Sequence, residues 1–595
     1  MLKPLIQSSV HATGQGLWGS MQKRWHIAEA APVEFAVQVG AHPLVGQLLW
    51  NRGVRTPEEV DVFLNPSWEK HIHDARKFAR MEGAVQRVLS ALEKGERITV
   101  HGDYDADGVT GSTVIINVLR EIAKTANFSL DQIDFYIPHR DKEGYGLHRD
   151  TVPKLKALGT ALIITVDCGI ACVEEIALAK GSDMDVVVVD HHNFGETVPD
   201  AHLIHPGLPD ETYPFKSLAA VGVSYKFACA LLATARERGI AVPEGWEKWL
   251  LDLVAIATVT DMVPLVGENR VLETYGLKVL NKTKRPGLRA ILEMAGVEPG
   301  NVTSETIGFG IGPRINAAGR MDHASLALRL MLSEDMDEAR DLATELEQLN
   351  KMRQDSTKKM MVEAEKMLDE QPGKIIVLWK ENWSPALVGL VAGRYMDKYS
   401  RPVIAVGFHE KHWIGSGRSI PSYNITDAVK AAGEGILTRS GGHGAACGFA
   451  LEDGKRLPEF AERLSEHASS IPDEELIPLL QIDAEIPLST VTMENAERVA
   501  AMEPFGMGNP KPLFVSRRCQ VLTCDTMGNG GAHIRLSLLD ENGRKMKAVG
   551  FKMGSRLLEI MQKPELDIVY TITINDWQGR RSAECHLVDV TPSKR

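Results

Sequence analysis

Four apolar runs in the first half of the chain each lead into acidic residues. The densest group follows the run 98–100 and contains His101, Asp103, Asp105 and Asp107. The later members are Asp167 after the run 162–166, Asp190, His191 and His192 after the run 186–189, and Asp261 after the run 251–259. Carboxylates and imidazoles together are ligands of divalent cations. The pattern therefore predicts a metal site that activates water for hydrolysis.

Two-metal hydrolysis accounts for the whole set of acids and histidines. Two cations about 4 Å apart lower the pKa of a bridging water and stabilise the pentacoordinate state of a phosphate under attack. Such a centre needs several carboxylates, one of them bridging, and one or two neutral imidazoles. Mn²⁺ suits this mixed ligation better than Mg²⁺. A single aspartate is as well explained by a helix cap or a turn, but the full set is not.

Two other motifs explain only part of the pattern. A calcium EF-hand loop opens with the spacing of Asp103–Gly108, but its twelfth residue must be Glu, and here it is Val114. The residues before Asp103 also indicate a strand rather than the helix that precedes such a loop. A haloacid-dehalogenase phosphatase begins with two acids after a strand, but it does not require the later acids or the His-His pair. We therefore reject both motifs.

The elements that must position these residues alternate between helix and strand from about residue 80 to residue 260. We expect helices over 81–92, 108–124 and 173–180, and strands over 97–100, 135–137, 162–166 and 186–189. Such alternation is typical of a mostly parallel sheet with helices on both faces. Ligands of these sheets bind beyond the carboxyl ends of the strands, which is where the acids fall.

The second half of the chain contains three further regions. Residues 324–369 are charged, helix-periodic and free of proline and glycine, which predicts helices that link two lobes; packing within one lobe is the alternative. A smaller α/β unit follows, with strands over 374–378 and 403–406, a helix over 386–396 and a glycine-rich run at 440–444. After about residue 472, alternating strands such as 533–538 and 568–574 predict a small β-barrel of the OB-fold type.

These regions suggest five parts, since 595 residues exceed what one hydrophobic core supports. We expect an N-terminal extension and helical segment at 1–75, a catalytic domain at 76–285, a helical connector at 286–370, a second α/β domain at 371–470 and the OB-fold barrel at 471–595. The first 20 residues lack the apolar core of a secretory signal. They are either an upstream extension with Met21 as the natural start or a disordered tail.

Charge and cysteine content restrict the setting in which the protein works. The net charge of −12 argues against indiscriminate coating of DNA, although a local basic groove can operate on an acidic protein. No apolar run approaches the length of about 18 residues that a membrane span needs. The seven cysteines are scattered and include no CxxC pair, which fits a reducing cytoplasm.

The motifs resemble those of the DHH phosphoesterase superfamily. They are His101–Asp107, Tyr136–Arg140, Glu143–Gly146, Val166–Gly169, Asp190–His192, Thr260–Asp261, Gly308–Phe309, Gly312–Arg320, Gly415–Ser419 and Gly441–His443. Their order and spacing resemble those of the bacterial single-strand-specific 5′→3′ DNA exonucleases of this superfamily, from about Met21 to the C-terminus. The resemblance implies a two-lobed nuclease of recombination and repair that releases 5′-mononucleotides.

The resemblance also implies roles for individual residues in the first lobe. The ligands of two cations, Mn²⁺ or Mg²⁺, would be Asp103, Asp105, Asp107, Asp167, His191 and Asp261. Asp167 would bridge the cations, His101 would support the ligands, and His192 would orient the site or a phosphate. A carboxylate or carbonyl should in turn hold each ligand imidazole.

The resemblance assigns the substrate strand to the second lobe, the DHH-associated (DHHA1) domain. Ser416, Arg418 and His443 would contact the DNA backbone, and Arg140 would join the first two in capturing a 5′-phosphate. An exposed salt bridge is the alternative for Arg418. Arg314 and Arg320 would line the strand channel, with pairing between the lobes as the alternative. The barrel residues expected to meet DNA are His533, Arg535, Lys545, Lys547, Trp577 and Arg580.

One departure and several alternatives remain. Ser384 stands where the family usually has histidine, so the contact of the second lobe there is expected to differ. Single-strand-binding protein and a recombination helicase are the partners implied for a monomeric enzyme. The alternatives are another DHH phosphodiesterase that acts on short oligonucleotides or cyclic dinucleotides, an inorganic pyrophosphatase, and a non-catalytic DNA-binding scaffold. The complete ligand set argues against the scaffold.

Overall fold

The computed structural model describes residues 23–368, 372–563 and 565–593, and the predicted start at Met21 lies outside them. The chain divides into two compact units. The first contains Asp74–Asp261 and Gly276–Pro478, and the second contains Arg24–His73, Met262–Tyr275 and Leu479–Arg595. No helix in the described part of the chain has the length and apolar character needed to cross a bilayer.

The first unit begins with a five-stranded sheet in the order β3-β2-β4-β5-β6, and every pair of neighbours is parallel. Its strands are β2 (Arg97–Gly102), β3 (Ile133–Tyr136), β4 (Thr160–Val166), β5 (Asp185–Val189) and β6 (His202–Ile204). The runs of β4 and β5 are buried on both faces, as in other parallel sheets. The predicted parallel sheet is confirmed.

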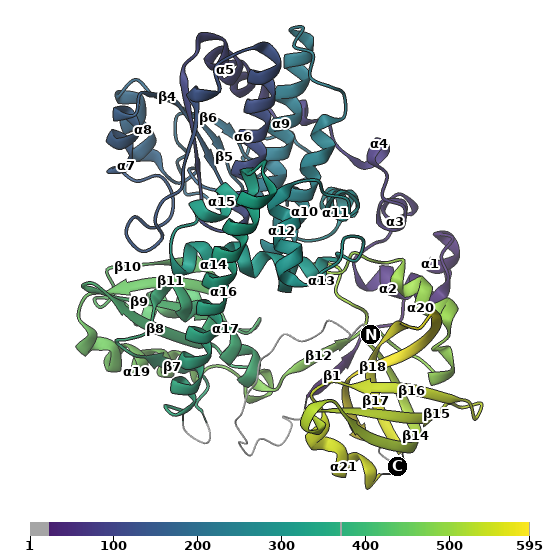
Figure 1. Cartoon of the computed structure of the whole chain (residues 1–595). Coiled ribbons are helices and arrows are strands. Elements are labelled where there is room, and N and C mark those ends of the chain that lie inside the picture. The colour runs from purple at the N-terminus through teal and green to yellow at the C-terminus, as the bar shows by residue number, and fades with distance from the viewer. Residues whose placement is uncertain (1–22, 369–371, 564, 594–595) are drawn as a thin grey trace. The chain divides into compact units, whose positions relative to one another are not determined.

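Helices cover both faces of this sheet (Figure 1). They are α5 (Met81–Lys94), α6 (Ala106–Ala126), α7 (Thr151–Ala157), α8 (Val173–Gly181), α9 (Ala220–Glu237) and α10 (Leu251–Thr260). Helices α7 and α8 lie on one face, and α5, α6 and α9 lie on the other. The loops after β2, β4 and β5 therefore meet at one edge of the sheet, between the two helical layers.

A helical region follows the first sheet. Its helices are α11 (Gly267–Leu280), α12 (Pro286–Ala295), α13 (Ser304–Thr306), the π-helix η4 (Ile307–Ile311), α14 (Gly312–Met321), α15 (Ser325–Leu332) and α16 (Met336–Glu365). Asp335 caps α16 by accepting hydrogen bonds from the amides of Asp337 and Glu338. The helices predicted over 324–369 are present as α15 and α16, and α16 begins after Asp335.

The second α/β domain contains a mixed sheet in the order β10-β11-β9-β8-β7. Its elements are β7 (Ile376–Trp379), α17 (Pro385–Tyr399), β8 (Val403–His409), β9 (His412–Arg418), α18 (Ile425–Ala432), β10 (Arg439–His443), β11 (Ala446–Leu451) and α19 (Leu457–Ala468). Only β7 and β8 are parallel; the other neighbours are antiparallel. The exposed strand β10 forms one edge of this sheet.

The second unit contains a closed barrel, as predicted from the alternating pattern. Its strands and helices are β13 (Ala484–Glu485), α20 (Met493–Ala500), β14 (Phe514–Met527), β15 (His533–Leu539), β16 (Lys545–Gly550), α21 (Leu557–Met561), β17 (Glu565–Trp577) and β18 (Arg580–Pro592). The order β14-β15-β16-β18-β17 closes because β17 also pairs with β14. Closure removes the free edges of the sheet.

Residues Arg24–His73 belong to the same compact unit as this barrel. Their elements are β1 (Arg24–Ile27), α1 (Val33–Gln38), α2 (Pro43–Asn51), α3 (Pro57–Leu64) and α4 (Trp68–His71). Strand β1 pairs in parallel with β12 (Leu479–Ile482). The Trp25 indole donates a hydrogen bond to Asp589 (2.9 Å), and Phe35 packs in the same apolar core as Phe514.

Arg270 joins three segments of the second unit. It is 1% exposed and lies over the Phe63 ring, 4.0 Å from the ring centre. Its guanidinium donates to the carbonyl oxygens of Phe63 (2.5 Å), Met502 (2.9 Å), Glu503 (2.9 Å) and Pro504 (3.3 Å). Burial, and then the charge of Arg52, lower the pKa of Arg270 to about 10. The four carbonyl groups satisfy a guanidinium that has lost its contact with water.

Candidate metal centre and nucleic-acid interface

The turn between β2 and α6 carries the first acidic cluster. Asp105 caps α6, and its carboxylate accepts hydrogen bonds from the amides of Asp107 (2.9 Å) and Gly108 (3.2 Å). A Cβ on Gly108 would lie 2.5 Å from the carbonyl oxygen of Asp103, so the turn requires glycine. This tight turn brings three carboxylates to the carboxyl edge of the first sheet.

Asp107 is fixed by the start of α9. Its two carboxylate oxygens accept hydrogen bonds from the amides of Ala220 (2.7 Å) and Val221 (2.8 Å). These amides and the dipole of α9 favour the ionised carboxylate. Nevertheless burial, and then the charges of Asp261 and Asp105, raise the pKa of Asp107 well above its usual range. The carboxylates thus repel one another strongly unless protons or cations compensate them.

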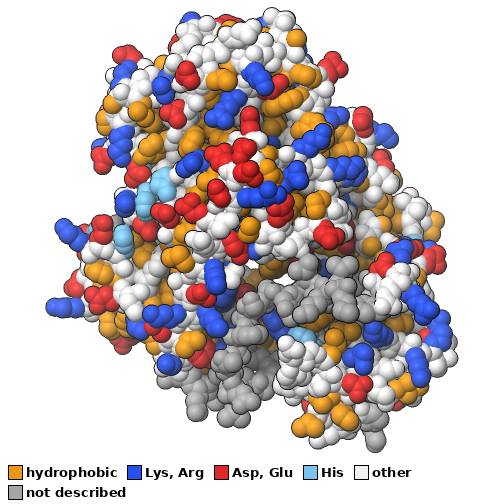
Figure 2. Space-filling view, in the orientation of Figure 1, with side chains coloured by type: hydrophobic (Ala, Val, Ile, Leu, Met, Phe, Trp, Pro, Cys, Tyr) orange, Lys and Arg blue, Asp and Glu red, His pale blue; other side chains and the backbone are white. Residues whose placement is uncertain are grey.

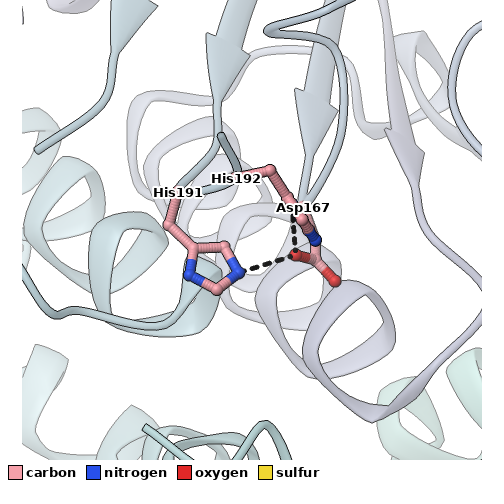
Figure 3. Close-up of side chains that lie close together, drawn as sticks. All are labelled: Asp167, His191 and His192. Carbon is pink, nitrogen blue, oxygen red and sulfur yellow. Dashed lines mark ion pairs between the residues drawn. The ribbon is translucent and has the colours of Figure 1, made fainter. Parts of the chain in front are cut away.

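Asp167 lies at the end of β4 in a backbone conformation that is rare for residues other than glycine, with φ of 62°. Figure 3 shows the imidazole rings of His191 and His192 beside its carboxylate. The Asp167 Oδ1 atom lies 3.4 Å from His191 Nε2 and 3.6 Å from His192 Nδ1. The loops after β4 and β5 therefore bring these residues together at the same sheet edge.

His191 faces carboxylates from three different segments. Its Nε2 atom lies 3.4 Å from Asp167, 3.6 Å from Asp261 and 3.8 Å from Asp107. Burial, and then the neighbouring charge of His192, lower the pKa of His191 to about 4. His191 is therefore neutral at physiological pH, which is the form that binds a metal.

Three groups of side chains place their ligand atoms within 4.8 Å of one another. The groups are Asp103, Asp105 and Asp167; Asp107, His191 and Asp261; and Asp167, His191 and His192. Asp167 belongs to two of them, as a bridging ligand must. The buried atoms Asp103 Oδ1, Asp167 Oδ1 and His191 Nε2 have no hydrogen-bond partner among the residues that the structure describes. These orphaned oxygen and nitrogen atoms fit divalent cations.

Asp190 holds His192 instead of joining the ligand groups. The Asp190 side chain is fully buried and accepts hydrogen bonds from the amides of Ile170, His191 and His192 and from His192 Nδ1 (2.9 Å). Burial opposes the charge on His192, but the hydrogen bond and the charge of Asp190 raise its pKa to about 9. The Tyr145 hydroxyl contacts the same ring nitrogen at 3.1 Å.

His101 lies behind the ligand groups and belongs to none of them. Its ring is buried in β2, stacks on Tyr136 and has Nδ1 3.7 Å from the Cys168 sulfur. Burial lowers the pKa of His101 to about 4, so the ring is neutral. In this position the His101 ring can support, by packing, the turn that carries Asp103.

We expect Asp190→Asn to remove the positive charge of His192. The wild-type pKa of about 9 keeps His192 protonated at pH 7.5. Without the hydrogen bond and charge of Asp190, burial is opposed only by the charges of Asp261 and Asp107, so the pKa of His192 should fall markedly. NMR titration of the metal-free protein should show a neutral ring at pH 7.5 in the variant. Metal-dependent hydrolysis at this site should fall by about 10- to 100-fold, as when other residues that orient metal-site ligands are lost.

The control for Asp190→Asn is Asp200→Asn, because the Asp200 carboxylate is exposed and pairs only with Lys180. Asp200→Asn should leave both the protonation state of His192 and the activity unchanged. A protonated His192 at pH 7.5 in a folded Asp190→Asn variant would contradict this role of Asp190.

Ser416, Arg418 and His443 lie in β9 and β10. Arg418 donates to the Ser416 hydroxyl (2.9 Å) and to the Gly417 carbonyl (2.7 Å), so these two predicted residues are adjacent. The Arg418 guanidinium has no carboxylate partner in the described part of the chain. His443 Nδ1 lies 3.2 Å from the side-chain nitrogen of Asn193, which follows the His-His pair. A contact between β10 and the metal-site loop thus links the two α/β domains.

The remaining predicted arginines differ in their partners. Arg140 lies over the Tyr104 ring, 4.8 Å from its centre. Arg320 donates to the carbonyl oxygen of Ala386 (2.9 Å) and joins α14 to α17. Burial, and then the charges of Arg140 and Arg353, lower the pKa of Arg320 to about 9. These guanidiniums form a local positive cluster beside the acidic turn.

Arg314 makes structural contacts within the helical region, which is not the pairing between lobes that was the alternative for this residue. Its guanidinium pairs with Glu347 of α16 (2.6 Å) and donates to the carbonyl oxygen of Gly310 (2.6 Å).

On the face shown in Figure 2, basic and acidic side chains are interspersed. Any contact with a polyanion on this face therefore depends on local groups rather than on a continuous basic surface.

Sequence reasoning missed two positioning residues. Asn316 accepts a hydrogen bond from the Ala106 amide (2.8 Å) and so ties α14 to the first turn of α6. Tyr145 donates to the carbonyl oxygen of Asp167 (2.9 Å), which fixes the unusual backbone at that residue. Both residues lie in motifs that the sequence already singled out, but neither motif shows which partner its side chain meets.

Comparisons with known proteins agree with this geometry. The chain matches the family descriptions "DHH family, N-terminal domain" at residues 97–258, "DHHA1 domain" at 372–470 and "RecJ OB domain" at 482–589. It is 36% identical over 563 residues to the single-stranded-DNA-specific exonuclease RecJ of Bacillus subtilis, covering 94% of this chain and 69% of that protein. For the Escherichia coli protein of the same name, identity is 33%, with 92% and 96% covered.

A solved structure agrees as well: RecJ of Thermus thermophilus in complex with Mn²⁺ superposes with a TM-score of 0.80 at 29% identity, covering 96% of this chain and 80% of that chain. The fold and the acid-histidine groups together define a DHH protein with a DHHA1 domain. Within that class, the chain belongs to the RecJ family.

Proposed function

We propose that the chain is a metal-dependent 5′→3′ exonuclease specific for single-stranded DNA, acting in recombination and repair. The observation that carries the proposal is the set of three ligand groups, in which Asp167 and His191 each belong to two groups. The relatives named as single-stranded-DNA-specific exonucleases support the choice of substrate. The sharing of Asp167 supports two cations rather than one, since a single carboxylate then serves both positions.

Six side chains would hold two divalent cations, Mn²⁺ or Mg²⁺. They are Asp103, Asp105, Asp107, Asp167, His191 and Asp261. When bound, the cations lower the pKa of water and neutralise charge on the scissile phosphate. The solved Thermus thermophilus structures in complex with Mn²⁺ and with Mg²⁺ support this choice of ions.

His192 would bind the substrate rather than the metal. Its Nδ1 atom is held by Asp190 and its pKa of about 9 keeps the ring charged, so Nε2–H donates to a phosphate oxygen. The catalytic residues on this proposal are Asp105, Asp107, Asp167, His191, His192 and Asp261. Tyr145 positions both Asp167 and His192 through one hydroxyl group.

The second domain would bind the DNA backbone near its 5′ end. Arg418 and Ser416 offer adjacent donors, and Arg140 adds a second guanidinium whose charge acts on Arg418. His443 would meet the backbone from the exposed edge strand β10. Arg320 would line the strand channel, and Arg314 would shape it through its contact with Glu347. The barrel would add Arg535, Lys545 and Lys547, which line one shallow pocket.

The partners, the oligomeric state and the compartment are part of the same proposal. We infer that the enzyme works on strands covered by single-strand-binding protein and together with a recombination helicase, as a monomer in the cytoplasm. All seven cysteines are free, which supports a reducing compartment. We retain the predicted domain limits of 76–285, 286–370, 371–470 and 471–595, and we join the N-terminal segment to the barrel because β1 pairs with β12.

The proposal is tested with DNA labelled at the 5′ or the 3′ end, in single-stranded and duplex form. With Mn²⁺, the protein should release labelled mononucleotide at once from the 5′-labelled single strand and shorten the 3′-labelled strand progressively. Blunt duplex should resist, and a chelator should abolish cleavage. A protein that cleaves only very short oligonucleotides would indicate another DHH phosphodiesterase, and metal-dependent binding without cleavage would indicate a scaffold.

A further inference from the structure

Phe309 is the most exposed aromatic side chain among the described residues, at 82%. It lies in the middle of the π-helix η4, directly after α13, which Figure 1 labels. Ile307 and Ile311 at the two ends of η4 are fully buried. They anchor the turn in the core and direct the phenylalanine ring to the opposite side, into solvent. The ring is therefore presented by a rigid element and not by a loose loop.

The glycines on either side of Phe309 are not required by the fold. A Cβ on Gly308 would meet nothing closer than Val259 at 3.9 Å, and one on Gly310 would meet Thr306 at 3.8 Å. Neither glycine has a positive φ. Because helical glycine lowers stability relative to alanine, folding alone does not explain the Gly-Phe-Gly run. Its effect is to leave both faces of the ring open, and π-helices frequently mark functional sites.

Packing fixes η4 relative to the candidate metal centre. A Cβ on Gly312 would lie 2.2 Å from the Thr260 side chain, so the start of α14 is pressed against the last turn of α10. The residue that caps this turn is the ligand Asp261. Asn316, on the same helix, accepts a hydrogen bond from the Ala106 amide in the acidic turn. The segment that carries Phe309 thus continues into a helix that is packed against the end of α10 and hydrogen-bonded to the acidic turn.

We propose that Phe309 stacks on an unpaired nucleobase of the bound strand and so holds that strand in register with the metal centre. This inference rests on the proposed function. A nucleobase fits because it offers a flat apolar face, whatever its identity, to an open aromatic ring. The bases of a duplex already stack on their neighbours within the helix, so the contact favours single strands. Phe309 is accordingly a positioning residue and takes no part in bond breaking.

The test uses the full-length protein with Phe309→Ala, Phe309→Leu and Phe309→Trp. Substrates are 5′-phosphorylated oligothymidylates, each with one abasic residue at a different position. Wild type should cleave most slowly when the abasic residue falls at the position that meets Phe309. Phe309→Ala should raise KM for the intact strand about tenfold and lose this dependence on abasic position. Phe309→Trp should keep the dependence, and Phe309→Leu should behave like Phe309→Ala.

A spectroscopic measurement gives a reading that is independent of cleavage. In chelator, 2-aminopurine placed at the identified position should be quenched on binding to wild type and to Phe309→Trp, but not to Phe309→Ala. Leu158→Ala is the matched control, because Leu158 is also an exposed apolar residue of the first unit, at 54%, and lies after α7. This control should match wild type in KM, abasic profile and fluorescence.

The outcomes separate the two proposals. A wild-type protein that cleaves single strands while Phe309→Ala and Phe309→Leu both keep its abasic profile and quenching would overturn the stacking role. A wild-type protein that fails to cleave single strands with Mn²⁺ would overturn the proposed function itself. Because Phe309 is exposed, all three variants should melt at the wild-type temperature. If Phe309→Ala melts early, Phe309→Leu, which retains an apolar side chain, decides the question.

Discussion

Asp167→Ala should abolish measurable exonuclease activity while leaving the fold intact. The carboxylate lies between His191 and the acidic turn and belongs to two of the three ligand groups, so its loss removes a ligand from both proposed cation positions. We expect the rate to fall by at least about a thousandfold, as with other residues that act as part of one catalytic unit. Calorimetry should show that Mn²⁺ binding is weakened in parallel.

The fold should tolerate Asp167→Ala because its carboxylate opposes the folded state when no metal is present. Burial, and then the charges of Asp107 and Asp105, raise the pKa of Asp167 well above its usual range. The metal-free variant should therefore melt at or above the wild-type temperature. Strain from alanine at the positive φ of position 167 offsets part of this gain. Asp200→Asn is again the control. Wild-type turnover by Asp167→Ala would refute the assignment of the metal centre.

Arg270→Met should loosen the second unit as a whole. The substitution keeps an apolar stem over Phe63 but removes the guanidinium donor from four carbonyl oxygens. Those of Met502 and Pro504 keep the Asn509 side-chain amide as a donor, whereas those of Phe63 and Glu503 lose the guanidinium bond outright. We expect a loss of about 3 kcal/mol or more in the stability of this unit. Hydrogen exchange should become faster in the amides of 24–73 and 479–595, and the sheet β2–β6 should keep its wild-type protection.

The comparison for Arg270→Met is Arg580→Met, which changes an exposed arginine of the same unit. Arg580→Met should leave exchange unchanged. Unaltered protection around β14 in Arg270→Met would show that the four hydrogen bonds contribute little, and that Phe63 packing alone holds the segments together.

The first sheet and the position of its acids could be predicted because their causes are local. Runs such as 186–189 are apolar and β-branched, and parallel strands place their carboxyl ends at one edge. The meeting of Asp107, Asp167 and His191 at that edge follows from topology alone. Family membership was also predicted and is confirmed, whereas the individual ligand and substrate roles stay predictions.

What the sequence could not predict depends on contacts between distant segments. No individual role was predicted for Asp190, and in the structure its oxygens accept from three backbone amides and from the His192 ring. Arg314 stands in a predicted DNA-binding motif, but Glu347 on the long helix α16 takes its charge. In each case the role of the side chain depends on a distant partner that no local sequence pattern identifies.

The pairing of β1 with β12 has a consequence for synthesis on the ribosome. Residues 24–27 leave the exit tunnel long before the strand they join, at 479–482, and before the barrel core that covers them. Since domains form as their residues emerge, the nuclease sheet can assemble first while the N-terminal strand waits, unpaired, for its partner. A stop codon placed before residue 479 would leave that strand permanently without one.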